Sequence, residues 1–352
     1  MRILICNERF LFRFGVDRVL LLLGAYWKAA GHEIIMMGNK LDEGVIQKHS
    51  DRFIKIPECP GYINGNEFTV DYIKQNWKKW FTRDTGPDVI LVAGWPYYAS
   101  LQFFRTKCGC VIFHDYGAVP TEGMHDAVLR VQERQAAMRQ QNLCHAHKII
   151  AISKFIENTQ SKKDSKGITP TVSVLLGVDH FALHMWEKDA LGLESDNTIA
   201  DVKAFQAKGY KILFMPGRWE SGNYKRSEFS IDIIRQIKSR GLKIKVLVLA
   251  SEETMGTIPE DVKDSYYPLG FVDDDTMRQL MEISDAGFSP TSWEGFDLPL
   301  AEMQYLNKCM FVLNIGAHPE VAAVRFSLSS YREQDWMRNV PLYAISCRGL
   351  WA

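Results

Sequence analysis

The chain has 352 residues, 46% of them hydrophobic and 24% charged, which are the proportions of an ordinary soluble globular protein. This length exceeds that of one typical hydrophobic core, so two domains are expected. The 42 basic and 42 acidic residues give a formal net charge of zero, and a general nucleic-acid-binding role therefore has no electrostatic support.

In the first half of the chain, short apolar runs alternate with longer amphipathic segments, the pattern of parallel strands joined by helices. The runs that predict strands are Ile3–Cys6, Glu33–Met37, Val89–Ala93, Cys110–His114, Lys148–Ala151 and Val172–Leu175. Helical patterns lie between them, notably at Val16–Ala30 and Glu122–Cys144. These elements predict an N-terminal domain over residues 1–185.

The alternation resumes after a polar stretch, residues 186–205, which we interpret as a linker. Strands are expected at Lys211–Met215, Ile244–Ala250, Tyr267–Gly270, Ala286–Ser289 and Met310–Asn314, with helices at Lys225–Arg240, Asp274–Ser284 and Leu298–Leu306. These elements predict a second domain over residues 206–352, with a poorly periodic, atypical tail at 322–352. The predicted fold class is α/β, with two Rossmann-like, doubly wound parallel sheets whose strand ends face a common cleft.

Cysteine spacing and hydropathy indicate the cellular compartment. The seven cysteines include no C-x-x-C pair, which argues against a metal site and for reduced thiols. The first residues, Met1–Cys6, read directly as a strand rather than as a signal peptide, and the apolar run Val19–Ala25 is too short to cross a bilayer. We expect a cytoplasmic protein with at most weak peripheral membrane contact. The aromatic and basic segment Tyr72–Phe81 could make that contact or touch a glycan, or could simply be an amphipathic helix packed inward.

Residues 289–302, Ser-Pro-Thr-Ser-Trp-Glu-Gly-Phe-Asp-Leu-Pro-Leu-Ala-Glu, carry the clearest chemical signal. They place Glu294 on a loop after a strand and Glu302 near the first turn of a helix, with Pro299 at a first helical position. A strand end, a glycine turn and a helix N-terminus together offer free N–H groups at a positive dipole end, which suits a nucleotide diphosphate. The alternative is an ordinary strand-to-helix connection with two solvated glutamates.

A second segment, Phe214–Arg218 followed by Lys225, brings two cations to the end of the first strand of the second domain. Arginine offers a bidentate fork to phosphate oxygens and lysine a compact charge, so this pair also suits a diphosphate. A solvated basic loop is the alternative. The phosphate-binding motifs G-x-G-x-x-G in the first domain and G-x-x-x-x-G-K-[ST] are both absent, which argues against a nicotinamide or P-loop enzyme.

In their order and spacing, these segments resemble family-4 retaining glycosyltransferases of the GT-B fold, over about residues 1–321. The family's G-R…K element matches Gly217-Arg218…Lys225, and its E-x7-E element matches Glu294…Glu302. Weaker matches follow in the family's order at Gly15–Val19, Phe113–Asp115, Ile150–Ser153, Gly177–Asp179 and Gly270–Val272.

The resemblance implies roles for the residues of the second domain. Arg218 and Lys225 would neutralise the leaving diphosphate without a metal. Glu302 would bind the ribose hydroxyls, and Glu294 would orient the donor sugar. The other donor-binding positions implied are Gly217, Phe271, Val272, Gly295, Phe296 and Leu298.

The resemblance implies that the donor binds mainly to the second domain and the acceptor to the first. In the first domain it places His114 near the transferred sugar and Gly15 close to the donor phosphates. Asp115 could be a helix cap or a base on the acceptor side. We read His32 and His318 as structural residues. Asp297 stands where the family commonly has glycine, and an acid there would repel a diphosphate, so capping of the helix is the expected role.

The implied function is a metal-independent hexosyltransferase that moves a hexose from a nucleoside-diphosphate sugar, its co-substrate, to a hydroxyl acceptor on a glycan or lipid. The resemblance places this reaction in polysaccharide or glycolipid assembly. No other cofactor and no nucleic-acid partner are expected, and the sequence does not predict an oligomeric state. Two alternatives remain: a sugar-nucleotide epimerase or hydrolase of the same fold, and a catalytically silent sugar-nucleotide-binding protein, which an apparently shortened second domain would favour.

Overall fold

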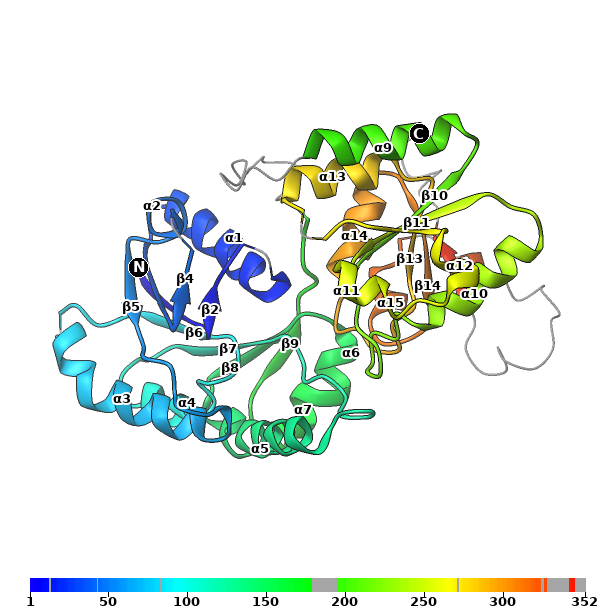
Figure 1. Cartoon of the computed structure of the whole chain (residues 1–352). Helices are drawn as coiled ribbons and strands as arrows, with labels where there is room; N and C mark the ends of the chain where they lie inside the picture. The colour runs from blue at the N-terminus through cyan, green and yellow to red at the C-terminus, as the bar shows by residue number, and fades with distance from the viewer. Residues whose placement is uncertain are drawn as a thin grey trace. The chain divides into compact units, whose positions relative to one another are not determined.

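The computed structural model describes residues 1–12, 14–42, 44–82, 84–178, 195–270 and 272–323, and the backbone of 326–327 and 342–345. The chain divides into two compact units, Met1–Leu176 and Gly177–Ala352 (Figure 1). The predicted donor-binding residue Phe271 and most of the predicted tail lie outside the described residues.

Unit 1 is built on a seven-stranded sheet in the order β5-β3-β1-β6-β7-β8-β9, with all neighbouring strands parallel. The strands are β1 Arg2–Cys6, β3 Glu33–Gly38, β5 Arg52–Lys55, β6 Val89–Val92, β7 Val111–Asp115, β8 Lys148–Ala151 and β9 Thr171–Ser173. A separate parallel pair joins β2 Arg9–Phe10 to β4 Lys40–Leu41. The strand order reverses between β1 and β6, so the switch point of this doubly wound sheet lies there.

Helices cover both faces of the unit 1 sheet. Figure 1 shows α1 and α2 on one face and α3, α4 and α5 on the other. Their bounds are α1 Gly15–Ala29, α2 Val45–His49, α3 Gly65–Trp80, α4 Ser100–Arg105 and α5 Asp126–Asn142, with short turns η1 Tyr62–Asn64, η2 Leu143–His145, α6 Lys154–Ile156, η3 Glu157–Ser161 and α7 Lys162–Asp164. Because both faces are buried, the strands read as nearly continuous apolar runs, as the sequence analysis expected.

Helix α3 contains most of the aromatic and basic segment Tyr72–Phe81, for which the sequence allowed two interpretations. Trp77 and Phe81 are buried with ring centroids 4.6 Å apart, and Trp80 packs against the same core. The segment Tyr72–Phe81 is therefore an amphipathic helix end packed inward, as one of the two interpretations proposed.

Unit 2 has the same kind of sheet. Five parallel strands run in the order β12-β11-β10-β13-β14, and β16 and β15 extend the sheet with antiparallel pairing. Their bounds are β10 Lys211–Arg218, β11 Ile244–Leu249, β12 Tyr266–Pro268, β13 Ala286–Ser289, β14 Cys309–Leu313, β15 Phe326–Ser327 and β16 Leu342–Ile345. The predicted α/β fold class with two parallel sheets is confirmed.

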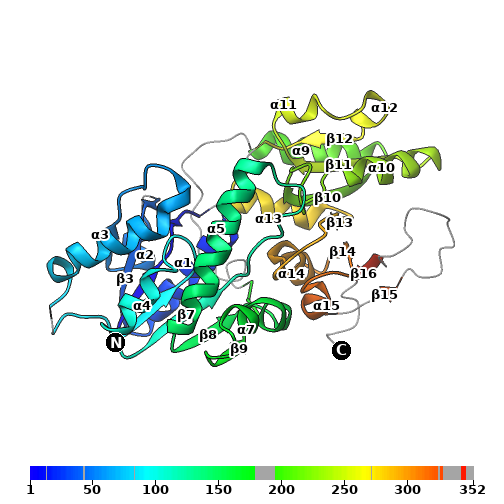
Figure 2. The same cartoon turned by 90° about the horizontal axis from the view of Figure 1, so that it is seen from below.

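One face of the unit 2 sheet carries α9 Ser195–Ala207, α13 Asp274–Ile283 and α14 Leu298–Tyr305, and the other carries α10 Phe229–Ser239, α11 Glu252–Met255 and α12 Glu260–Lys263. Figure 2 shows the short helix α15, His318–Val321, beside α14. Residues 195–205, which the sequence analysis placed in a linker, belong to α9, where Val202 is fully buried in the core. No helix of the described residues has the length and apolar character needed to cross a membrane.

Candidate functional site at the start of helix α14

The site begins where strand β13 turns into helix α14. Asp297 is the N-cap residue of this helix, and its Oδ1 accepts a hydrogen bond from the Leu300 N–H at 3.3 Å. Its backbone is left-handed, with φ at 75°, a conformation that glycine adopts more easily than other residues. The expected capping role of Asp297 is confirmed. The first turn of any such helix leaves N–H groups without intrahelical partners, at the positive end of the helix dipole.

The charge of Asp297 is compensated by His318. Its Oδ2 lies 2.8 Å from His318 Nε2, while His318 Nδ1 lies 2.7 Å from the carbonyl oxygen of Leu313. The Leu313 carbonyl and an ionised Asp297 carboxylate both accept hydrogen bonds, an arrangement that favours an imidazole that donates from both ring nitrogens, which is its charged form. Burial lowers the pKa of His318, but the hydrogen bond and charge of Asp297 outweigh burial and the pKa is raised. The sequence analysis treated His318 as structural and did not foresee this pair.

Lys225 and Glu294 form the second ion pair of the site. Lys225 Nζ lies 2.7 Å from Glu294 Oε1, and the two side chains are 26% and 14% exposed. Burial lowers the pKa of the ammonium, but the adjacent Glu294 carboxylate outweighs it, so the pKa of Lys225 is raised and the group stays charged. The structure therefore brings together two of the residues that the sequence analysis selected from segments 69 positions apart.

Backbone contacts join the loops that carry these residues. The carbonyl oxygen of Tyr224 accepts hydrogen bonds from the Ser292 N–H at 2.8 Å and from Thr291 Oγ1 at 3.1 Å. The Ala317 N–H donates to the Glu294 carbonyl at 3.0 Å. Loops that follow three adjacent strands, β10, β13 and β14, are thus fixed against one another at the carboxyl edge of the sheet, where doubly wound folds bind ligands.

The other predicted residues of unit 2 are less closely associated. Arg218, at the end of β10, has a side chain 69% exposed and forms an ion pair with Glu220 at 3.0 Å. Glu302 and Phe296 are buried. The remaining predicted positions differ in exposure: Gly217 is exposed, Val272 and Leu298 are half-buried, and Gly295 is buried.

In unit 1, His114 is a buried residue near the end of β7. Its Nδ1 lies 3.0 Å from the Tyr116 hydroxyl, and burial lowers the pKa of its imidazole to about 4, so the ring is neutral at pH 7. Gly15 is the first residue of α1 and is exposed. Within the described parts of both units, no three His, Cys, Asp or Glu side chains converge as a set of metal ligands.

Asp115 takes neither of the roles that the sequence analysis considered. It is fully buried and receives two hydrogen bonds from Arg139, at 2.7 and 2.6 Å. Arg139 also donates to Asp164 at 2.5 Å, and Ser161 donates to Asp115 at 2.5 Å. With its oxygens occupied by these partners, Asp115 is a structural ion-pair residue that fixes the end of β7.

Solved structures similar to this chain are enzymes of one architecture. A sucrose-phosphate synthase from Thermosynechococcus elongatus superposes with a TM-score of 0.70 at 16% identity, over 91% of this chain and 83% of that chain. A glycosyltransferase from Rickettsia africae gives 0.59 at 17% identity, over 90% and 80%. Anabaena HepE, in complex with UDP and glucose, gives 0.55 at 14% identity, over 87% and 78%.

The fold is GT-B. Two doubly wound units in one chain and superposition on glycosyltransferases over most of both chains establish this architecture. No protein-family model matches the sequence, and no curated protein matches it. At identities of 14–17%, these superpositions show that the chain has the GT-B fold, and they do not show which reaction it catalyses.

Proposed function

We propose that this GT-B protein is a retaining glycosyltransferase, which moves a hexose from a nucleoside-diphosphate sugar to a hydroxyl acceptor without a metal. The observation that carries the proposal is the convergence of Lys225, Glu294 and the start of α14 at one sheet edge. An ammonium, a carboxylate and a helix N-terminus supply the groups that bind a diphosphate joined to a polyhydroxylated sugar.

Each group has a part in this reaction. Lys225 and the positive end of the α14 dipole stabilise negative charge on the departing diphosphate, as an oxyanion site does. Glu294 accepts hydrogen bonds from sugar hydroxyls, and Arg218, on the exposed end of β10, supplies a second cation. The Asp297–His318 pair is neutral as a unit, so the acid at the helix start does not repel the diphosphate.

In the proposed transfer, the bond between the sugar's anomeric carbon and the diphosphate oxygen breaks, and its electron pair leaves with the diphosphate. The acceptor oxygen bonds to the same face of that carbon, and its proton passes to the departing phosphate. This route follows from the resemblance to family-4 enzymes. The same resemblance implies Glu302 at the ribose, His114 near the sugar, and a glycan or lipid acceptor in polysaccharide or glycolipid assembly. That Anabaena HepE is described with UDP and glucose supports a donor of this class.

Turnover by two variants tests the proposal. Lys225→Ala and Glu294→Gln should each lower the release of nucleoside diphosphate from a nucleotide-sugar panel by about 100-fold or more, the usual effect of removing one transition-state partner. Circular dichroism should show both variants folded, and Lys263→Ala, on exposed α12, should turn over as the wild type does.

Full activity in both site variants would contradict the assignment. A wild-type protein that binds a nucleotide sugar but transfers nothing to any acceptor would instead be the silent binding protein. Donor turnover that requires no acceptor would point to the epimerase or hydrolase.

A further inference from the structure

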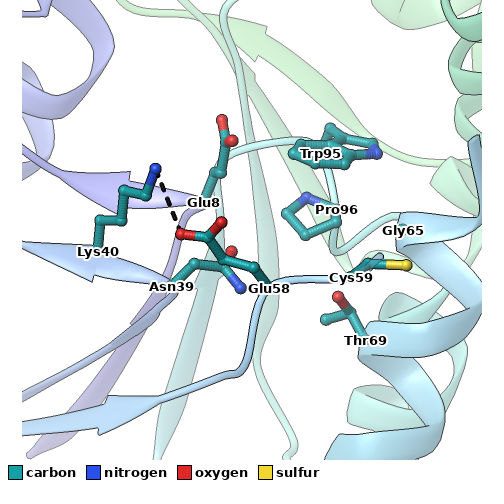
Figure 3. Close-up of a pocket in the computed structure, with 9 residues that line it drawn as sticks. All are labelled: Glu8, Asn39, Lys40, Glu58, Cys59, Gly65, Thr69, Trp95 and Pro96. Atoms are coloured by element: carbon teal, nitrogen blue, oxygen red, sulfur yellow. Dashed lines mark ion pairs between the residues drawn. The ribbon is translucent and has the colours of Figure 1, made fainter. Parts of the chain in front are cut away.

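Unit 1 contains a pocket at the switch point of its sheet (Figure 3). Loops that follow β1, β3, β5 and β6 line it together with the start of α3; the lining residues are Glu8, Asn39, Lys40, Glu58, Cys59, Gly65, Thr69, Trp95 and Pro96. In doubly wound sheets, ligands bind outside the carboxyl ends of the strands at this reversal of strand order. The position of the pocket therefore points to a ligand site within unit 1.

The charges around the pocket leave one carboxylate in excess. Lys40 Nζ pairs with Glu58 Oε1 at 3.2 Å, so these two charges offset each other. Glu8 is half-buried, and its carboxylate makes no side-chain hydrogen bond and no ion pair within 4 Å among the described residues. Burial raises its pKa, and the more distant charges of Arg9 and Lys40 only partly offset that effect. Arg9, the cation next to Glu8 in sequence, pairs with Asp17 at 3.2 Å. A ligand that donates hydrogen bonds to Glu8 is favoured here, and an anionic ligand is repelled.

An aromatic ring forms the opposite side of the pocket. Figure 3 shows Trp95 and Pro96 on one side and Glu8 and Glu58 on the other. A Cβ atom on Gly65 would lie 2.5 Å from Trp95 Cζ2, so the indole occupies space that only glycine leaves open. An indole face carries partial negative charge and attracts the weakly positive C–H groups on one side of a sugar ring. An aromatic platform facing hydrogen-bond acceptors fits a sugar better than it fits an apolar ligand.

We propose that this pocket binds a sugar unit without negative charge, which stacks on Trp95 and donates hydrogen bonds from hydroxyl or amino groups to Glu8. The identification of that sugar as the acceptor rests on the proposed transferase function; the binding site itself does not. The proposal restricts the acceptor to a neutral or amino sugar and excludes sugar phosphates and other anionic sugars.

Saturation-transfer NMR titrations of the full chain with glucose, glucosamine and glucose 6-phosphate test the charge selectivity. The wild type should bind glucose and glucosamine saturably, and glucose 6-phosphate at least tenfold more weakly. Glu8→Gln should weaken glucosamine binding at least fivefold, and Glu8→Lys should reverse the preference in favour of glucose 6-phosphate. Equal binding of glucose and glucose 6-phosphate by the wild type, or no saturable sugar binding, would overturn the proposal.

A matched pair of glycine variants tests the platform. Gly65→Ala adds a methyl group against Trp95, whereas Gly109→Ala adds one where no atom lies within 4 Å. Glucose binding should fall at least fivefold in Gly65→Ala and stay unchanged in Gly109→Ala. An unchanged affinity in a folded Gly65→Ala would contradict the role of Trp95.

Titration of the same samples with UDP, GDP and ADP separates this inference from the proposed function. Nucleotide binding without sugar selectivity would refute only the pocket in unit 1. Selective sugar binding without any nucleotide binding would refute only the donor site in unit 2.

Discussion

Asp297 places a negative charge at a helix start that is proposed to bind a diphosphate. An aspartate at the start of α14 caps the helix but would oppose an incoming diphosphate. His318 removes the opposition, since it contributes a positive charge 2.8 Å from the carboxylate, in a site where both residues are buried. The acid at position 297 and the histidine at position 318 therefore form one charge-compensated pair.

Substitution of one member alone should expose this dependence. His318→Gln leaves a buried carboxylate without its cation, which should lower the free energy of unfolding by about 3 kcal/mol and weaken nucleoside-diphosphate binding about tenfold. The double variant Asp297→Asn/His318→Gln removes both charges and retains a capping side chain, so it should recover most of both losses. Chemical denaturation and nucleotide titration of the wild type, His318→Gln, Asp297→Asn and the double variant measure the coupling. Additive effects of the two substitutions would contradict it.

The same pair predicts a dependence of stability on pH. The pKa of His318 in the folded protein is raised above its unfolded value of about 6.5. The stability that it contributes is therefore complete below pH 6.5 and is lost as the pH rises through the folded pKa, at about 1.4 kcal/mol for each unit between the two values. Denaturation midpoints of the wild type should fall over this range more steeply than those of Asp297→Asn/His318→Gln. Parallel curves would show that His318 does not titrate as described.

At the scale of elements, the site depends on three loops at one edge of the unit 2 sheet. The loop after β14 closes directly on the loop after β13: a Cβ atom on Gly316 would lie 2.4 Å from the Glu294 carbonyl oxygen, and Gly316 has φ at 53°. Close backbone approach and a left-handed conformation both require glycine at this turn.

Gly316→Ala should therefore displace the loop that carries Glu294. We expect a loss of about 2 kcal/mol in stability from the strained backbone and a clear drop in nucleotide affinity. Gly86→Ala is the matched control, since its new methyl group would meet only an ordinary contact at 3.6 Å. Equal nucleotide affinity in the two variants would show that this loop does not position the site.

The elements that carry the site could be predicted because local signals specify them. Apolar runs predicted the strands that flank the site, and Asp297 and Pro299 fit the start of α14 as residues that favour a helix N-terminus. Helix α9 was missed because it follows a polar stretch and because only three large apolar residues, Ile199, Val202 and Phe205, mark its buried face.

Contacts between distant segments were harder to predict. The approach of Lys225 to Glu294 was expected only through the resemblance to known enzymes. His318 and Asp297 are 21 positions apart in the sequence. Asp297 caps α14, whereas His318 opens α15 after strand β14, and no local sequence pattern indicates that they pair. Likewise, nothing in the sequence near Asp115 indicates that Arg139 will neutralise it, 24 positions away in a helix.

At the scale of the whole molecule, the two doubly wound units carry two different candidate sites, each at the carboxyl edge of its own sheet. The site in unit 2 offers cations and a helix N-terminus, which suit a diphosphate. The pocket in unit 1 offers an aromatic ring and an excess carboxylate, which suit an uncharged or amino sugar. This contrast in charge is consistent with the proposed function, whose central claim is that the site in unit 2 binds an anionic nucleoside-diphosphate donor.

Thermal unfolding of the wild type and Lys225→Ala with UDP, GDP, ADP and their sugars tests this claim most directly. A ligand at 100 times its dissociation constant stabilises the folded state by about 2.7 kcal/mol, which is a readily measured rise in melting temperature. We predict such a rise in the wild type with one of the three nucleoside diphosphates, and a rise at least as large with the corresponding nucleotide sugar. In Lys225→Ala the same ligands should give a much smaller rise. No rise with any nucleotide, or equal rises in both proteins, would contradict the assignment of the donor site.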